Sequence, residues 1–160
     1  MVQVDDIYVA LQAVKDPEIP VISVVDMGII TGVAIPEPNH AVVTMTPTFV
    51  GCPAINYMQL QVRKVVVALG FTKVEVNIDF STPWSSNRIT ETGLQQLKDF
   101  KLSPPRKHNG DISVADLSLA ECPHCGSTNT SLNTPFGPTL CRALHFCYDC
   151  NQAFEQFKPV

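Results

Sequence analysis

The chain has 160 residues and a mass of 17.5 kDa, which suits one domain or two small ones. With 45% hydrophobic and 16% charged residues the composition is typical of a globular protein, and it excludes wholesale disorder. The 11 basic and 15 acidic residues give a net charge of −4, which offers no attraction to nucleic acid or to an anionic bilayer. We therefore expect neither nucleic acid nor a membrane as a partner.

The cellular compartment is indicated by the N-terminal segment and by the cysteines. Residues 1–20 carry four acidic side chains and lack the basic and apolar regions of a signal peptide, and no stretch of the chain approaches the roughly 20 apolar residues of a membrane span. We therefore expect a cytoplasmic protein. In that reducing compartment the six cysteines favour metal or thiol chemistry over disulfides.

The first elements in chain order are a helix and a hairpin. Apolar residues at helical spacing between Val4 and Val14, with acidic residues at the start, predict an amphipathic helix that ends before Pro17. Two segments rich in β-branched residues, 28–35 and 41–45, flank a run of turn-forming residues. This pattern predicts a β-hairpin.

A second helix and a third strand follow. Pro53 stands where a first helical residue would be, and apolar residues at 55, 58, 62, 65 and 69 mark one helical face that ends at Gly70. Residues 74–80 then alternate between apolar and polar side chains, which predicts a half-buried strand. The N-terminal half of the chain therefore predicts a small α/β sandwich with a three-stranded sheet.

The rest of the chain predicts a boundary and a second, smaller domain. Thr90 is placed to cap a short helix through Leu97, and the prolines at 104 and 105 forbid its continuation. The following segment is polar and rich in helix breakers, as linkers are. We expect an α+β protein with an α/β domain over residues 1–102, a linker over 103–117 and a zinc ribbon over 118–160.

The C-terminal cysteines carry the strongest chemical signal. Two C-x-x-C turns, Cys122 to Cys125 and Cys147 to Cys150, lie on either side of residues 126–146, and a Gly or Asn follows each turn and lets it close. Four thiolates in this pattern predict a tetrahedral metal site, with zinc favoured. Iron or an iron–sulfur cluster on the same four residues, or ordinary buried or disulfide-bonded cysteines, are the alternatives.

Three further residues of the C-terminal segment are potential ligands. Cys141 is an additional candidate ligand, with a packed thiol as the alternative interpretation, and His124 and His145 are expected to make ordinary polar contacts. The segment from 118 to 160 carries two basic and three acidic side chains, so its charge does not favour a phosphate-binding role. A segment of about 40 residues has little core, and a bound metal would supply much of its folding free energy.

The remaining cysteine, Cys52, lies just before the predicted second helix. The unpaired N–H groups and positive end of a helix favour a thiolate there, which could bind iron or zinc, accept an iron–sulfur cluster or act as a nucleophile. Asp16 and Glu18 lie on a loop that could reach the same end of the sheet. The alternative is structural: the thiol fills an N-cap or core position and the acids cap turns.

Enzymatic machinery is not evident from the sequence. No histidine stands near Cys52 to act as its base, and the chain has no nucleophile elbow, Walker loop or dinucleotide-binding fingerprint. We therefore expect an accessory protein and not an enzyme in its own right.

Several motifs resemble known families. Residues 16–20 (DPEIP) and 46–53 (TPTFVGCP) resemble the small domain shared by iron–sulfur assembly factors of the SufT and cytosolic targeting type, over roughly residues 4–80. With residues 83–84 (PW), 104–105 (PP), 122–127 (CPHCGS) and the closing cysteines added, the whole chain resembles the PaaD (PaaJ) family, the D component of the phenylacetyl-CoA epoxidase system. The chain departs from the family pattern at Met27 and at residues 87–88.

The resemblance implies a function in aerobic phenylacetate degradation. It implies an accessory protein that matures or delivers iron or iron–sulfur centres to the epoxidase oxygenase or its reductase, with iron–sulfur carrier proteins as further partners. Zinc in the ribbon and a transient cluster or iron at Cys52 are the implied cofactors. The alternative is a non-catalytic structural subunit of the multicomponent oxygenase, and a homodimer with Cys52 of each chain near one site is a further expectation.

Overall fold

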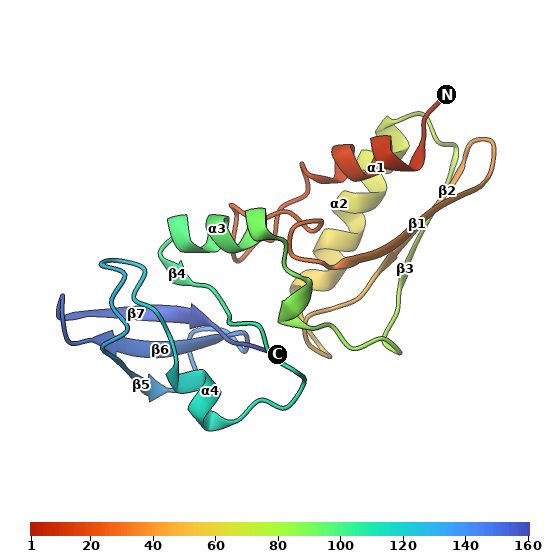
Figure 1. The fold of residues 1–160 in the computed structure, drawn as a ribbon. Helices are drawn as coiled ribbons and strands as arrows, with labels where there is room; N and C mark the ends of the chain where they lie inside the picture. Colours follow the sequence, from red (N-terminus) through yellow and green to blue (C-terminus); the bar gives the residue numbers. More distant parts are fainter. The chain divides into compact units, whose positions relative to one another are not determined.

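The chain folds as two units, Met1–Trp84 and Ser85–Val160, in a computed structural model that describes all 160 residues. The first unit contains, in order, α1 (Val4–Leu11), β1 (Ile30–Glu37), β2 (His40–Met45), α2 (Ala54–Ala68) and β3 (Lys73–Ile78) (Figure 1). The second contains the 3-10 helix η1 (Ser86–Arg88), α3 (Glu91–Asp99), β4 (Leu102–Ser103), α4 (Val114–Ser118), β5 (Thr130–Thr134), β6 (Arg142–Cys147) and β7 (Gln152–Phe157). No helix has both the length and the apolar character to cross a bilayer.

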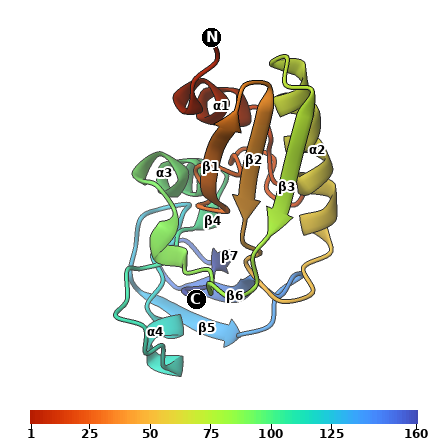
Figure 2. The same ribbon diagram turned by 90° about the vertical axis from the view of Figure 1, so that its right-hand side faces the viewer.

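The sheet of the first unit has the order β1-β2-β3 (Figure 2). β1 and β2 form the predicted antiparallel hairpin, and Asn39 in its turn adopts a left-handed conformation with φ of 65°. β3 pairs with β2 in parallel, because α2 carries the chain back to the end of the sheet where β2 began. The predicted three-stranded sheet is therefore confirmed.

The core of the first unit lies between this sheet and its two helices, which Figure 1 shows on one side of the strands. The face of α2 that meets the sheet is built from Met58, Val62 and Val66, each at most 1% exposed. The helical spacing predicted Val65 on this face, but Val65 is only half-buried. α1 ends at Leu11, and Val14 is buried in the loop that follows the helix.

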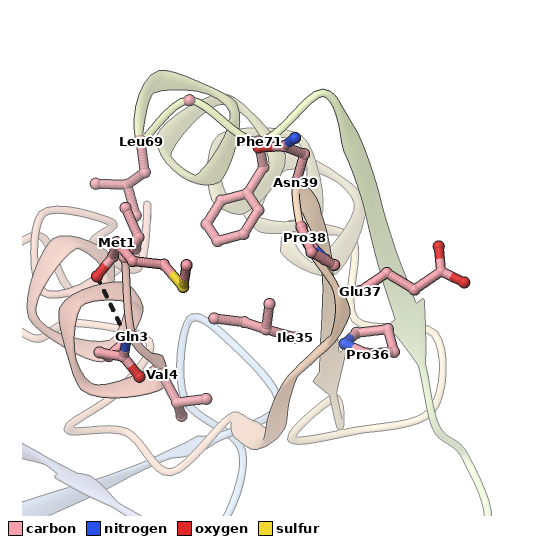
Figure 3. Close-up of a pocket in the computed structure, with 12 residues that line it drawn as sticks. Met1, Gln3, Val4, Ile35, Pro36, Glu37, Pro38, Asn39, Leu69 and Phe71 are labelled. Carbon is pink, nitrogen blue, oxygen red and sulfur yellow. Dashed lines mark hydrogen bonds between the residues drawn. The ribbon is translucent and has the colours of Figure 1, made fainter.

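One end of the first unit is hollowed beside the hairpin turn. Figure 3 shows this pocket, which is lined by the N-terminal residues from Met1 to Val4, by the turn from Ile35 to Asn39 and by the end of α2 from Leu69 to Phe71. Its lining is mostly apolar, and it holds no cysteine or histidine. None of the residues that the sequence marks as candidate ligands lies in it.

The second sheet has the order β4-β7-β6-β5. β5, β6 and β7 form the antiparallel ribbon that the sequence predicts, with Cys147 at the end of β6. The short strand β4 adds to its edge by pairing in parallel with β7, where Ser103 lies opposite Gln156. The ribbon therefore recruits a strand from a part of the chain that the sequence assigned to the linker boundary of the first domain.

The units divide after Trp84, whereas the sequence placed the end of the first domain at residue 102. The predicted helix after Thr90 is present as α3, and the Thr90 hydroxyl caps it by accepting the N–H of Gly93. The helix belongs with the second unit because it runs directly into β4, whose Ser103 hydroxyl donates to the Glu121 carbonyl at 2.7 Å. That bond fixes the end of α3 beside the ribbon.

The segment predicted as a linker, residues 103–117, is also tied into the second unit. The Asn87 side chain donates to the His108 carbonyl at 2.7 Å and accepts the His108 N–H at 3.1 Å. Ser113 caps α4, with its hydroxyl accepting the Asp116 N–H. That residues 1–102 and 118–160 fold as separate domains stays a prediction.

The core of the first unit yields a direct test of stability. Met58→Ala removes a side chain that is 1% exposed and is expected to lower the free energy of unfolding by about 2–5 kcal/mol. Leu60→Ala is the control on the same helix, since Leu60 is 50% exposed, and is expected to cost about 1 kcal/mol or less. Urea denaturation of the full chain measures both, and equal losses would contradict the assigned helix face.

Candidate metal centre

The two C-x-x-C turns meet at one end of the ribbon. Cys122 and Cys125 precede β5, Cys147 ends β6, and Cys150 lies in the turn before β7. Their four sulfur atoms all lie within 4.8 Å of one another. The Cys122 and Cys150 sulfurs are 3.7 Å apart, and those of Cys125 and Cys147 are 3.5 Å apart.

These distances fit a tetrahedral thiolate site. Four sulfurs at about 2.3 Å from a central zinc ion would be separated by about 3.8 Å along each edge of the tetrahedron. The two closest pairs, at 3.7 Å and 3.5 Å, already lie near that separation. The donor set is also suitable, because soft thiolates in tetrahedral geometry select zinc or iron. The four residues therefore form a zinc-ribbon-like cluster.

Backbone geometry explains why each turn closes. Gly126 and Asn151 follow the second cysteine of each turn and adopt left-handed conformations, with φ of 76° and 56°. In the first turn the Gly126 N–H donates to the Cys122 carbonyl and the Cys122 N–H donates to the Ser127 carbonyl, both at 2.8 Å. The predicted role of the Gly and Asn in closing the turns is confirmed.

The cysteine thiols do not share one pKa. The backbone N–H of Cys150 donates to the Cys147 sulfur and lowers the pKa of Cys147 to about 7, with help from the N–H of Asp149. Loss of hydration raises the pKa of Cys150 to about 12. Four neighbouring thiols therefore do not all ionise at neutral pH on their own, and a metal ion that binds them must displace protons.

A hydrogen-bond network joins the two turns outside the cluster. The Asp149 carboxylate accepts from the Ser127 hydroxyl and, at 2.8 Å, from the Asn129 amide, and these bonds lower the pKa of Asp149. The Tyr148 N–H donates to the Asn129 carbonyl at 3.0 Å. The sequence did not single out these residues; the position of Asp149 inside a C-x-x-C turn was the one available signal.

The apolar core beneath the cluster is small. It consists of Ala120, Cys122, Cys147 and Phe154, with Cys150 packed against it. The Phe154 ring stacks on His145 at 5.3 Å between centroids. Two of the four core side chains are themselves cysteines of the cluster, so the stability of this end of the ribbon depends on what the cysteines bind.

The spare potential ligands lie outside the four-sulfur group. His145 is fully buried, burial lowers its pKa, and its Nε2 atom lies 2.8 Å from the Gln156 amide oxygen. His124 is exposed. The Cys141 sulfur lies 3.0 Å from the Thr139 hydroxyl, just before β6 begins, whereas Cys147 stands at the other end of that strand.

Cys52 lies in the first unit, in the loop between β2 and α2, and is partly exposed. Its N–H donates to the Phe49 carbonyl at 3.2 Å, and α2 begins two residues later. Asp16 caps a turn by accepting the N–H groups of Glu18 at 2.7 Å and Ile19 at 3.1 Å. Cys52, Asp16 and Glu18 of one chain do not gather their ligand atoms within 4.8 Å, as the four ribbon cysteines do.

Comparison with known proteins assigns both units to families. A model of the PaaD zinc beta ribbon domain matches residues 108–158, and a model of the iron-sulfur cluster assembly protein matches residues 4–78. The fold and the cluster therefore define a protein class in which an iron–sulfur-assembly-type α/β unit precedes a four-cysteine ribbon.

A full-length relative narrows this class further. The chain is 33% identical over 158 residues to a protein of Escherichia coli K12 that is named as the D-subunit of a "Putative 1,2-phenylacetyl-CoA epoxidase", covering 99% of this chain and 94% of that protein. The chain therefore belongs to the PaaD family, as a homologue of the D component of phenylacetyl-CoA epoxidase.

The first unit has relatives of its own. An Fe-S protein maturation auxiliary factor of Porphyromonas gingivalis is 35% identical over 94 residues, which are 58% of this chain and 89% of that protein. The crystal structure of a domain of unknown function, DUF59, from Bacillus anthracis is 33% identical and has a TM-score of 0.55, covering 59% of this chain and 90% of that one. The sequence-based assignment to both families is confirmed.

Replacing one cluster cysteine tests the metal centre. In Cys125→Ser the fourth thiolate is lost, and the full chain is expected to retain less than about a tenth of the wild-type metal after dialysis. Cys141→Ser is the matched control, because the same substitution is made outside the four-sulfur group, and it is expected to retain the metal. Elemental analysis of the purified proteins measures this, and equal metal content in the two variants would contradict the assigned ligand set.

Proposed function

We propose that this protein is an accessory factor for aerobic phenylacetate degradation that matures or delivers iron or iron–sulfur centres to the oxygenase of phenylacetyl-CoA epoxidase or to its reductase. The observation that carries the proposal is the union, in one chain, of an iron–sulfur-assembly-type unit and a PaaD ribbon. Maturation is the printed role of relatives of the first unit, and the epoxidase is named for a relative of the whole chain.

In this proposal the ribbon has a structural role. Cys122, Cys125, Cys147 and Cys150 would hold zinc, which supplies folding free energy to a unit with little apolar core. All four positions of a tetrahedral ion would be filled by protein sulfurs, which leaves no open position for a substrate. The ribbon would then act as the module that docks on the epoxidase components or on iron–sulfur carrier proteins.

Cys52 is the proposed site of iron or cluster transfer. Its partial exposure and its place before α2 make the sulfur accessible, and the N–H groups at the start of a helix favour its thiolate. The thiolate would donate an electron pair to iron, and a cysteine of the client would later replace it while Cys52 regains its proton. Asp16 and Glu18 are candidate oxygen ligands, and a second chain in a homodimer would bring a second Cys52 thiolate.

The chemistry around Cys52 supports an accessory role over an enzymatic one. His40 is the one histidine of the first unit, and its Nε2 atom lies 2.9 Å from the Glu75 carboxylate, on the sheet and not in the loop of Cys52. A thiol-dependent enzyme would need a base near that sulfur. Lys73 lies 3.4 Å from the same Glu75 oxygen, which makes this group a surface ion-pair cluster.

The alternative function is a non-catalytic structural subunit of the oxygenase complex. It is favoured by the separation of Asp16 and Glu18 from a shared ligand group with Cys52 within one chain, and by the use of the Asp16 carboxylate as a turn cap. In this alternative both units contribute docking surfaces, and Cys52 is dispensable.

Cys52→Ser separates the two functions. The serine preserves the size and N-terminal position of the side chain but is a poor iron ligand, so the transfer proposal predicts epoxidase components that assemble with at least a threefold deficit in iron or acid-labile sulfide. The measurement is metal analysis of the oxygenase and reductase purified from cells that carry this variant. Cys141→Ser is the control, and full iron loading with Cys52→Ser would support the structural alternative instead.

A further inference from the structure

We propose that Lys101 is a positioning residue of the four-cysteine centre, and that residues 98–103 belong to that centre. This inference rests on the proposed metal binding by the ribbon cysteines. The segment comprises the end of α3, the strand β4 and the residues that join them. It lies between the two stretches that the family models match, 4–78 and 108–158, so neither family description accounts for it.

Three side chains of this segment bond to the first C-x-x-C turn and the residue before it. The Lys98 ammonium lies 2.9 Å from the Glu121 carboxylate, and the Ser103 hydroxyl donates to the Glu121 carbonyl at 2.7 Å. The Lys101 ammonium donates to the Pro123 carbonyl at 3.3 Å. Glu121 precedes Cys122 and Pro123 follows it, so these bonds hold the chain on both sides of a cluster cysteine.

The backbone at Lys101 indicates that its side chain is needed. Lys101 follows the C-cap of α3 with φ of 64°, a left-handed conformation that glycine adopts freely and that lysine adopts with strain. A glycine would end the helix at this position without that strain. Lysine instead supplies an ammonium group that reaches the metal-binding turn, and strain of this kind is retained where the surrounding structure uses the residue.

Charge gives Lys101 its distinct role among the three. Four thiolates around a divalent cation carry a net charge of −2, and Asp149 in the second turn adds a further negative charge. Lys98 is already paired with a carboxylate, that of Glu121. Lys101 bonds to a neutral carbonyl, so its positive charge remains to offset the thiolates and thereby stabilise their ionised, metal-binding form.

The test uses the full chain and four single variants. Lys101→Gln removes the charge, Lys101→Gly removes both the charge and the backbone strain, and Lys101→Arg keeps the charge. Lys107→Gln is the control, because the Lys107 ammonium donates to the Asn87 carbonyl, which is not part of either C-x-x-C turn. The apparent dissociation constant for zinc is measured by competition with a chromogenic chelator. The sulfur-to-metal absorption of the cobalt-substituted proteins and the thermal stability of the metal-free proteins are recorded as well.

The expected result is a dissociation constant about tenfold higher for Lys101→Gln and Lys101→Gly, a value within about threefold of wild type for Lys101→Arg, and no change for Lys107→Gln. The cobalt band is expected to shift in the two variants that lack the charge. The glycine variant is decisive on the backbone, since a role limited to chain geometry predicts that Lys101→Gly binds zinc at least as tightly as wild type.

Three results would overturn the inference. Unchanged zinc affinity in Lys101→Gln and Lys101→Gly would remove the role of the charge, and so would a loss confined to the stability of the metal-free protein. Equal losses in Lys101→Gln and Lys107→Gln would make the effect a general one of net charge. If the wild-type chain itself bound neither zinc nor cobalt through four thiolates, the metal centre would fail as well, which the other three outcomes leave intact.

Discussion

The second unit depends on four sulfur atoms that converge within 4.8 Å of one another. Beneath them lie only four buried apolar side chains, two of which are cysteines of the cluster. So small a core offers little hydrophobic stabilisation against the conformational entropy of the ordered chain. A metal ion bound by the four thiolates would supply the missing free energy, and the surrounding hydrogen bonds then have one purpose, which is to hold two turns in the geometry the ion requires.

The two units differ in how they are stabilised, and the difference suits a division of roles. The first unit buries a continuous core between a three-stranded sheet and two helices, so it has no need of a metal for its fold. Cys52 can therefore stay in a loop at the edge of that core, partly exposed and outside any permanent ligand set. A sulfur that is not required for folding is available for transient binding, which is what a transfer site demands.

The sequence predicted the elements whose signals are periodic or closely spaced. The hairpin, both helices of the first unit and the two C-x-x-C turns follow from alternation, helical spacing and turn chemistry, and the structure has all of them. β4 was missed because a strand of two residues shows no periodicity. The support by Lys101 was missed because a lysine after a helix normally lies in solvent, and neither its left-handed backbone nor its long-range bond to Pro123 leaves a local signal. Met27, a departure from the family pattern, is 1% exposed and keeps an apolar side chain in the core.

X-ray absorption spectroscopy at the zinc edge of the full chain, purified without added metal, measures the central claim most directly. Four sulfur neighbours at about 2.3 Å, with no nitrogen or oxygen in the same shell, are the predicted result. A shell that contains nitrogen or oxygen, or a folded protein without a metal edge at all, would contradict the view that four thiolates and one ion hold the second unit together.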